Sequence, residues 1–290
     1  MRTKLILTMA AIPALLAAQH RYNGRDWRQH DEETIQRTFN VSEGSGPQKL
    51  LVDNISGYVH VTGYAGNEIQ VKAQRRTGAD STEALQAAKR DVKLDMSQQG
   101  NFVRLYVDGP FRSSNGTNYR GDEYYGYRVA FDYDIQVPTA TEVVLKTIND
   151  GDIVVKKTTG DYEVNGLNGG IEMEEVGGSG IVKTLNGPVK VSFSRNPAKP
   201  SEFRSLNGKV EIYFQPGLNA DLNFHTLNGG IYTDFEVAAR PTQTSAGESA
   251  STKFVYRSDR RRMSGRVGSG GPELTFDTLN GSILLHSKAL

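Results

Sequence analysis

The sequence predicts an all-β protein of the parallel β-solenoid class, with coils of about 20 residues. Three observations lead to this prediction. An Asn-Gly turn recurs through the second half of the chain, the apolar residues around it keep the same phase, and the chain is rich in Gly and Tyr. An antiparallel β-meander or sandwich is the alternative, because Asn-Gly taken alone is the strongest short signal for a hairpin.

The repeat aligns on one glycine. From Gly151 to Gly229 the aligned glycines are 18 or 21 residues apart, and the last one follows after a long insertion. An apolar residue stands two positions after each glycine, as in Ile171 and Val189, so every copy reads as strand, turn and strand. The aligned positions are Gly57, Gly151, Gly169, Gly187, Gly208, Gly229 and Gly281. We interpret the turns as corners at which the chain adopts positive φ and the Asn side chains of successive coils stack.

Residues 1–18 have the layout of a secretory signal peptide, with a short basic start and an apolar run that is too short to span a bilayer. Residues 19–45 are polar and read as a leader that becomes ordered only near Phe39. Residues 46–290 are expected to form a single β-solenoid domain.

Within this domain the strand pattern is interrupted once by a helical period, at residues 81–91. Asp80 is the expected N-cap of this helix, with Glu83 as its partner in a capping box. Two stretches without strand or helix period, residues 112–127 and 239–271, are predicted as long surface loops.

Composition excludes several classes of function. The chain has no cysteine, so disulfides and zinc–thiolate sites are ruled out. Without Arg2 and Lys4 of the signal peptide, 32 of the 34 basic side chains remain against 33 acidic ones. This balance gives no reason to expect nucleic acid as a partner. No later segment is apolar enough for a membrane span in the mature chain, and nothing in the sequence sets an oligomeric state.

No catalytic motif is found. The five histidines are not at metal-ligand spacing, and neither a metalloprotease nor a serine-hydrolase motif is present. Acidic residues such as Glu172 and Glu174 alternate with apolar ones, which is typical of a solvated strand face. We therefore expect no enzyme activity, no metal and no cofactor. A polysaccharide-active β-helix enzyme is the alternative, because such enzymes use acidic grooves.

Four tyrosines in the first long loop are the candidate ligand contacts: Tyr119, Tyr124, Tyr125 and Tyr127. Tyrosine offers a large rigid face with a polar tip, which suits contact with a carbohydrate or a protein. The alternative is that some of them cover the end of the core or belong to a strand.

The copies of "TLNG", the ending "GRVGSGGPELTFDTLNGSILL" and the segment "DYDIQVP" resemble the bacterial putative-adhesin family of β-strand-repeat proteins. This family is a domain of unknown function related to the auto-transporter adhesin head domain. The resemblance covers roughly residues 38–290 and implies a right-handed β-solenoid. The tyrosine-rich loop and the arginine-rich insertion near residue 260 depart from the family pattern.

These observations together predict an exported, non-catalytic protein of the cell envelope, found in the periplasm, at the cell surface or outside the cell. It would act as an adhesin-like binding protein or as an envelope scaffold. A cell-surface glycan or an envelope protein is the expected partner. A protein-binding regulator of envelope stress is a further alternative.

Overall fold

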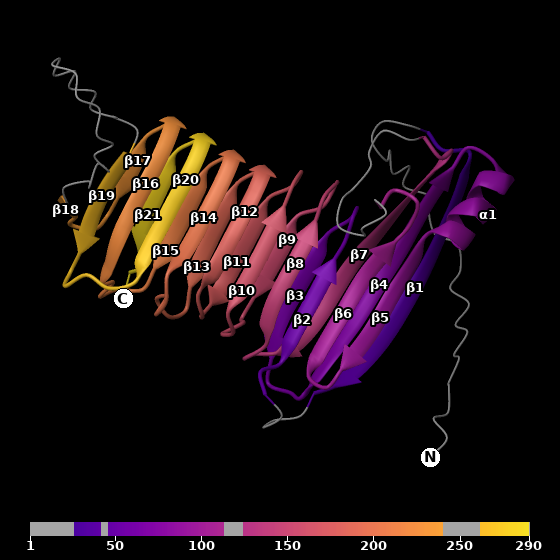
Figure 1. The fold of residues 1–290 in the computed structure, drawn as a ribbon, viewed down its shortest axis with the longest axis horizontal. Helices are drawn as coiled ribbons and strands as arrows, with labels where there is room; N and C mark the ends of the chain where they lie inside the picture. The colour runs from indigo at the N-terminus through magenta and orange to yellow at the C-terminus, as the bar shows by residue number, and fades with distance from the viewer. Residues whose placement is uncertain (1–25, 42–45, 113–123, 240–261, 290) are drawn as a thin grey trace, which may run out of the picture.

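The computed structural model describes residues 26–41, 46–112, 124–239 and 262–289, and these form an elongated all-β molecule with one short helix (Figure 1). Two large mixed sheets face each other along its length, and neither is closed. The expected all-β class is therefore confirmed. The two-layer layout fits the sandwich alternative. The inner strands, however, pair in parallel and not antiparallel as that alternative assumed.

The first sheet has ten strands. Its spatial order is β1 (Gln29–Asn40), β4 (Glu68–Ala79), β7 (Tyr127–Pro138), β3 (Val59–Tyr64), β9 (Ile153–Lys156), β11 (Ile171–Val176), β13 (Val189–Phe193), β15 (Val210–Phe214), β21 (Ile283–Ser287) and β17 (Ile231–Thr233). From β7 to β17 every neighbouring pair is parallel. Only β1 and β4 join antiparallel.

The second sheet has eleven strands. Its order is β18 (Ala238–Ala239), β19 (Arg262–Val267), β16 (Ala220–Asn228), β20 (Glu273–Asn280), β14 (Ser201–Asn207), β12 (Gly180–Asn186), β10 (Tyr162–Gly166), β8 (Glu142–Thr147), β2 (Lys49–Asp53), β6 (Phe102–Asp108) and β5 (Lys93–Gln99). Antiparallel pairs are again confined to the two ends, at β18–β19–β16 and β5–β6.

Each Asn-Gly turn joins a strand of one sheet to a strand of the other. β12 ends at Asn186 in the eleven-stranded sheet, and β13 begins at Val189 in the ten-stranded sheet. These turns are therefore corners and not hairpins. We call two strands joined by such a corner a coil. The Asn side chains form a ladder across successive coils, with amide-to-carbonyl distances of 2.7–3.1 Å from Asn149 through Asn168, Asn186, Asn207 and Asn280 to Asn228.

The aligned glycines are required for a different reason from the one we predicted. Positive φ occurs at only two of the seven, Gly57 and Gly187. At Gly208 a Cβ atom would lie 2.1 Å from the carbonyl oxygen of Gly187 in the preceding coil. The same overlap recurs at each aligned glycine from Gly151 to Gly281. Glycine is therefore needed because the corner backbones stack too closely for any side chain.

The core lies between the two sheets and is continuous along the molecule. Alternate residues of the inner strands point inward, and the apolar residues two positions after the aligned glycines form one row, in the order Ile171, Val189, Val210, Ile283 and Ile231. Across the other sheet the rings of Phe203, Phe276 and Phe224 stack at centroid distances of 5.6 and 5.3 Å.

The C-terminal coil lies out of chain order. Strands β20 and β21 insert between β14–β15 and β16–β17 in the two sheets, so the last repeat of the sequence is an inner coil of the stack. The link from β19 to β20 passes the start of β16, where Asn219 Oδ1 accepts a hydrogen bond from the Ser269 backbone N–H at 2.9 Å. Strand β16 is thereby held between β19 and β20.

Two predicted boundaries need correction here. The loop expected at 239–271 contains strand β19, which pairs antiparallel with β16 and β18, because backbone pairing can hold a strand that has no apolar pattern of its own. Strand β1 likewise lies within the expected polar leader. It pairs along its full length with β4, although its side chains are mostly exposed.

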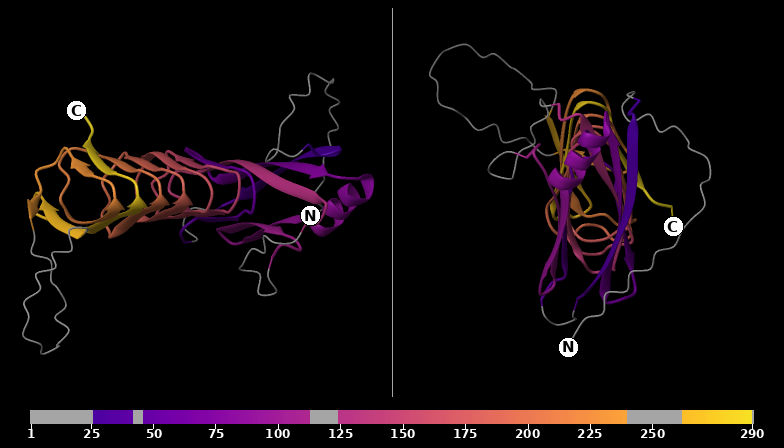
Figure 2. Two further views of the ribbon diagram at one scale, coloured as in Figure 1. Left: turned by 90° about the horizontal axis from the view of Figure 1, so that it is seen from above. Right: turned by 90° about the vertical axis from the view of Figure 1, so that its right-hand side faces the viewer.

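The N-terminal end is closed by several contacts between the sheets. Helix α1 (Thr82–Asp91) lies at this end between the two layers (Figure 2). Arg37 of β1 donates to the Met96 carbonyl of β5 at 2.5 Å, and Gln98 donates to the Asn40 carbonyl at 2.6 Å. The helix was predicted, but its N-cap is Ser81 and not Asp80, because the Ser81 hydroxyl accepts the Ala84 N–H.

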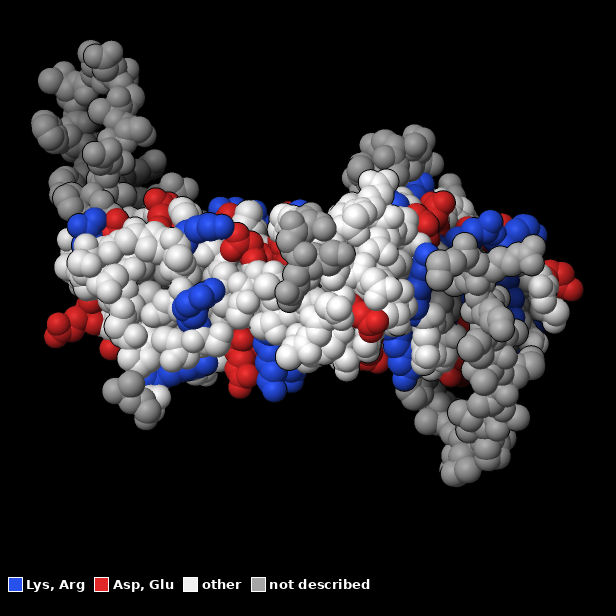
Figure 3. All heavy atoms as spheres, turned by 90° about the horizontal axis from the view of Figure 1, so that it is seen from below, with Lys and Arg blue, Asp and Glu red and all other residues white. Residues whose placement is uncertain are grey.

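The expected signal peptide, residues 1–18, lies outside the described residues, as do residues 113–123 and 240–261 of the two predicted loops. Among the described residues no helix is long and apolar enough to cross a membrane. Lys, Arg, Asp and Glu are interleaved on the face shown in Figure 3, and no large area there has a single sign of charge.

Candidate functional site

The four predicted tyrosines do not form one surface. Tyr119 lies outside the described residues. Tyr124 is 60% exposed, and its hydroxyl donates to the Asp80 carboxylate. Tyr125 donates to the Pro110 carbonyl at 3.2 Å, and its ring stacks on Tyr127.

Tyr127 is the first residue of β7 and belongs to the core. Burial, with a smaller contribution from the Asp91 carboxylate, raises its pKa above the ordinary value. Of the three described tyrosines, only Tyr124 exposes most of its ring. Ligand contact by the predicted tyrosines stays a prediction.

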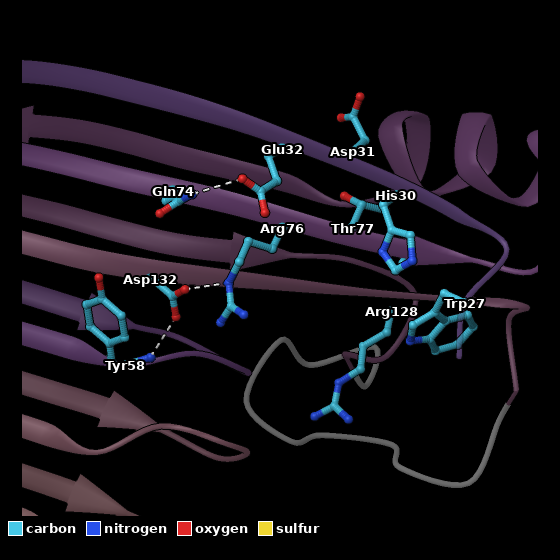
Figure 4. Close-up of a pocket in the computed structure, with 11 residues that line it drawn as sticks. Trp27, His30, Asp31, Glu32, Tyr58, Gln74, Arg76, Thr77, Arg128 and Asp132 are labelled. Carbon is cyan, nitrogen blue, oxygen red and sulfur yellow. Dashed lines mark hydrogen bonds and ion pairs between the residues drawn. The ribbon is translucent and has the colours of Figure 1, made fainter. Parts of the chain in front are cut away.

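A more extensive arrangement lies on the outward face of β1, β4 and β7. A pocket of about 510 Å³ opens there, lined by side chains from these three strands and by Trp27 and Tyr58 (Figure 4). Strand alternation explains which residues reach it. In β4 the side chains of Arg75 and Thr77 point into the core, so Gln74 and Arg76 point outward.

Register then brings partners from β1 and β7 beside these residues. Glu32 lies opposite Arg76, and Asp132 lies opposite Gln74. Arg76 Nε is 2.5 Å from Asp132 Oδ2, while Asp132 Oδ1 accepts the Tyr58 backbone N–H at 3.1 Å. The Asp132 side chain is only 4% exposed. Because both of its oxygens are engaged, this carboxylate is fixed in place and orients the Arg76 guanidinium.

Tyr58 closes one side of the pocket. Its ring stacks on His60 with centroids 4.2 Å apart, and its hydroxyl donates to Asp134 at 3.5 Å. Partial burial, followed by the nearby Asp134 and Asp132 carboxylates, raises the pKa of Tyr58 above its ordinary value.

Trp27 closes the opposite side, and it is the single tryptophan of the chain. Its ring lies against the backbone of Gly78, where a Cβ atom would come within 2.5 Å of the indole. Glycine at this position of β4 therefore makes room for the indole. Figure 4 shows the ring beside the Arg128 side chain, whose guanidinium forms an ion pair with Asp150.

A second hollow of about 440 Å³ continues the same face, lined by residues of β1, β3, β4 and β7. His60 lines this hollow, and Tyr58 lines the first one, so their stacked rings join the two. We call the two hollows together the N-terminal trough. Its residues are Trp27, His30, Asp31, Glu32, Gln36, Arg37, Thr38, Tyr58, His60, Thr62, Gln70–Lys72, Gln74, Arg76–Gly78, Arg128, Asp132 and Asp134–Gln136.

Sequence reasoning missed this site. Trp27 lies in the segment assigned to a polar leader, and most of the other residues come from β1, from the consecutive strands β3 and β4, and from β7, which lie in three separate parts of the chain. The available signal was the set of polar residues at alternate positions of β4 and β7, which also describes any solvated strand face. Among the described residues, no group of three or more His, Asp or Glu side chains could hold a metal ion. The trough thus offers fixed hydrogen-bonding groups and aromatic faces.

Comparison with known proteins gave matches in structure alone. No family model matches the chain, and no curated protein matches it significantly. A crystal structure described as a putative cell adhesion protein from Clostridium sporogenes aligns with a TM-score of 0.45 and 11% identity, over 88% of this chain and 100% of that one.

A putative adhesin from Bacteroides fragilis aligns with a TM-score of 0.36 and 14% identity, over 88% and 97% of the two chains. For a putative lipid binding protein from Parabacteroides distasonis the values are 0.24 and 12%, again over 88% and 97%. We draw nothing on function from likeness at this level.

Proposed function

We propose that this chain is an exported, non-catalytic binding protein of the adhesin type that holds its ligand in the N-terminal trough. The observation that carries the proposal is the pair of Arg76 and Asp132, fixed between Trp27 and Tyr58 on an otherwise open sheet face. Rigid polar groups between aromatic rings are the usual composition of a ligand-binding hollow.

The geometry favours binding over catalysis. A carboxylate that acts as general base must be able to accept a proton from the substrate. Asp132 is instead engaged by Arg76 and by the Tyr58 N–H, and Glu32 accepts a hydrogen bond from Gln74 at 3.2 Å. These groups are arranged to present fixed donors and acceptors to a bound molecule.

The coils from β8–β9 onward would serve as the scaffold. We propose that they wind as a right-handed parallel β-solenoid and form one domain with the N-terminal strands of the same two sheets. The parallel register of the inner strands, the corners between the sheets and the Asn ladder support this proposal. The basic and apolar start of the sequence supports export, and the resemblance to the putative-adhesin family supports a place in the cell envelope.

The test is capture of ligands by the exported form of the chain. The immobilised protein is exposed to a glycan array and to envelope extracts, and binding is compared with that of two variants. Trp27→Ala should lose the captured ligand. Tyr232→Ala removes an exposed ring at the other end of the same sheet and should keep it. Equal binding by Trp27→Ala would refute the trough as the site.

Tyr124 is proposed as an additional ligand contact. Its ring is exposed, so replacing Tyr124 and Tyr125 by Ser should reduce binding without abolishing it. Full binding by that double variant would exclude these tyrosines and leave the trough as the whole site.

A further inference from the structure

We infer that the ligand of the N-terminal trough is an uncharged glycan chain, bound lengthwise along the strands. This inference rests on the proposed function and adds the chemical class of the ligand. It follows from the length of the trough, its charge balance, the type of its hydrogen-bonding groups and the placement of its rings.

The trough is long and runs along the strands. It extends on β4 from Gly78 to Gln70, which corresponds to about 26 Å at roughly 3.3 Å per residue. The stacked rings of Tyr58 and His60 lie where the two hollows meet. An extended, linear ligand fits this shape better than a compact metabolite.

The charges of the trough balance. Its outward basic side chains are Arg76, Lys72 and Arg128, and its outward acidic side chains are Glu32, Asp132 and Asp134, whereas Arg37 and Asp31 of β1 point to the other face of the sheet. Most of them already have partners in the protein. Arg76 pairs with Asp132, Arg128 pairs with Asp150, and Asp134 lies 3.5 Å from His60. An anionic polymer would need an excess of positive charge, which the trough does not have.

Uncharged amides and hydroxyls supply most of the remaining polar lining. Gln70 and Gln136 lie opposite each other in one row across the strands, with Thr38 and Thr62 at its ends, and Gln74 projects outward further along β4. An amide side chain carries a donor and an acceptor side by side, and a hydroxyl is both at once. A sugar ring presents the same combination on adjacent carbons, so these groups complement vicinal hydroxyls.

The rings supply the apolar part of the contact. Indole and phenol faces are flat, rigid and able to pack against the C–H face of a sugar ring. Trp27 lies at one end of the trough, and the Tyr58–His60 stack lies near its middle. A protein partner would be expected to find a continuous apolar centre. The residues that line the trough are mostly polar or charged, and Trp27 and the Tyr58–His60 stack lie apart within it.

The single tryptophan makes the inference directly measurable. Emission of Trp27 is followed while the protein is titrated with uncharged polysaccharides (dextran, laminarin, xylan and galactan) and with anionic ones (polygalacturonate and heparin). We expect at least one uncharged polymer to shift the emission in a saturable way. Its midpoint should change by less than about twofold between low and high salt, because no net charge is neutralised.

Variants test the class of the ligand and the location of its site separately. Gln74→Ala should weaken binding of the uncharged polymer about 2- to 10-fold by calorimetry, as expected for one hydrogen bond. Gly78→Val, which displaces the indole, should abolish it, whereas Tyr232→Ala should leave it unchanged.

A response to anionic polymers alone, or to no polysaccharide, would overturn the ligand class. If Trp27→Ala nevertheless abolishes capture of another ligand, the trough remains the site. If it does not, the proposed function fails as well.

Discussion

The short distance between neighbouring coils limits which residue types fit at certain positions of this fold. The aligned glycines show this most clearly, because the carbonyl of the adjacent corner occupies the position that a Cβ atom would take. A hydroxyl two positions before every Asn of the ladder except Asn168 adds to the same contact. Thr184, for example, donates to the Gly169 carbonyl at 2.8 Å. The corner is therefore a stacked column of backbone rather than a set of independent turns.

Adjacent glycines in one corner test this explanation. A Cβ at Gly169 would lie 2.3 Å from the Gly151 carbonyl oxygen, whereas at Gly170 the nearest atom would be at an ordinary 3.4 Å. Neither residue has positive φ. Gly169→Ala should lower the free energy of unfolding by about 1–3 kcal/mol, and Gly170→Ala by less than about 0.5 kcal/mol, in urea denaturation. Equal effects would show that stacking is not the cause.

Asp161 gives a residue-scale prediction on pH. The hydrogen bond from the Lys199 ammonium, at 2.6 Å, and that from the Ser179 N–H lower the pKa of Asp161 below its ordinary value. A lowered pKa in the folded state means stabilisation that is present above the unfolded pKa and lost as pH falls through the folded one. Lys199→Met should therefore be less stable than wild type at neutral pH. The difference should shrink as the pH falls through the lowered pKa of Asp161 and vanish once this carboxyl is protonated, and a difference independent of pH would contradict the pairing.

At the scale of elements, local patterns and long-range pairing determined different parts of the structure. The helical period predicted α1, and the phase of the apolar residues predicted the inward rows, because both depend only on nearby residues. Strands β1 and β19 were missed because their main stabilisation is backbone pairing with β4 and β16. The N-terminal trough was missed for the same reason, since register between distant strands assembles it.

The start of α1 can be tested separately. Ser81 accepts the Ala84 N–H at 3.2 Å and is the N-cap, while Asp80 accepts a hydrogen bond from Tyr124. Ser81→Ala should cost about 1 kcal/mol of stability and Ser81→Gly only a few tenths. Asp80→Ala should not reproduce the loss. A larger effect at Asp80 than at Ser81 would support the cap that the sequence predicts.

At the scale of the whole molecule, the order of coils in space departs from their order in the chain. All repeats share one apolar phase, so the sequence cannot distinguish a last coil at the end of the stack from one inserted inside it. The structure inserts it, and the Asn ladder runs from Asn207 to Asn280 and only then to Asn228. The order of the coils is therefore set by the link from β19 to β20, which returns the chain past the start of β16.

Engineered disulfides can establish this order, because the chain has no cysteine of its own. Arg204 and Asp277 are direct neighbours in parallel strands. Cysteines at these two positions should crosslink under mild oxidation. Cysteines at Arg204 and His225 should not, since β20 lies between their strands and separates them by about 9.6 Å. Crosslinking of the second pair alone would place the coils in chain order.

The central claim is that the coils provide stability and the N-terminal trough provides binding. Thermal unfolding with and without the captured ligand tests both parts in one measurement, because a ligand raises the Tm of a protein only where it binds the folded state. Gly169→Ala should lower the Tm and keep the ligand-induced increase. Trp27→Ala should keep a Tm close to that of wild type and lose the increase. The opposite pattern, with binding lost in Gly169→Ala and retained in Trp27→Ala, would contradict the account.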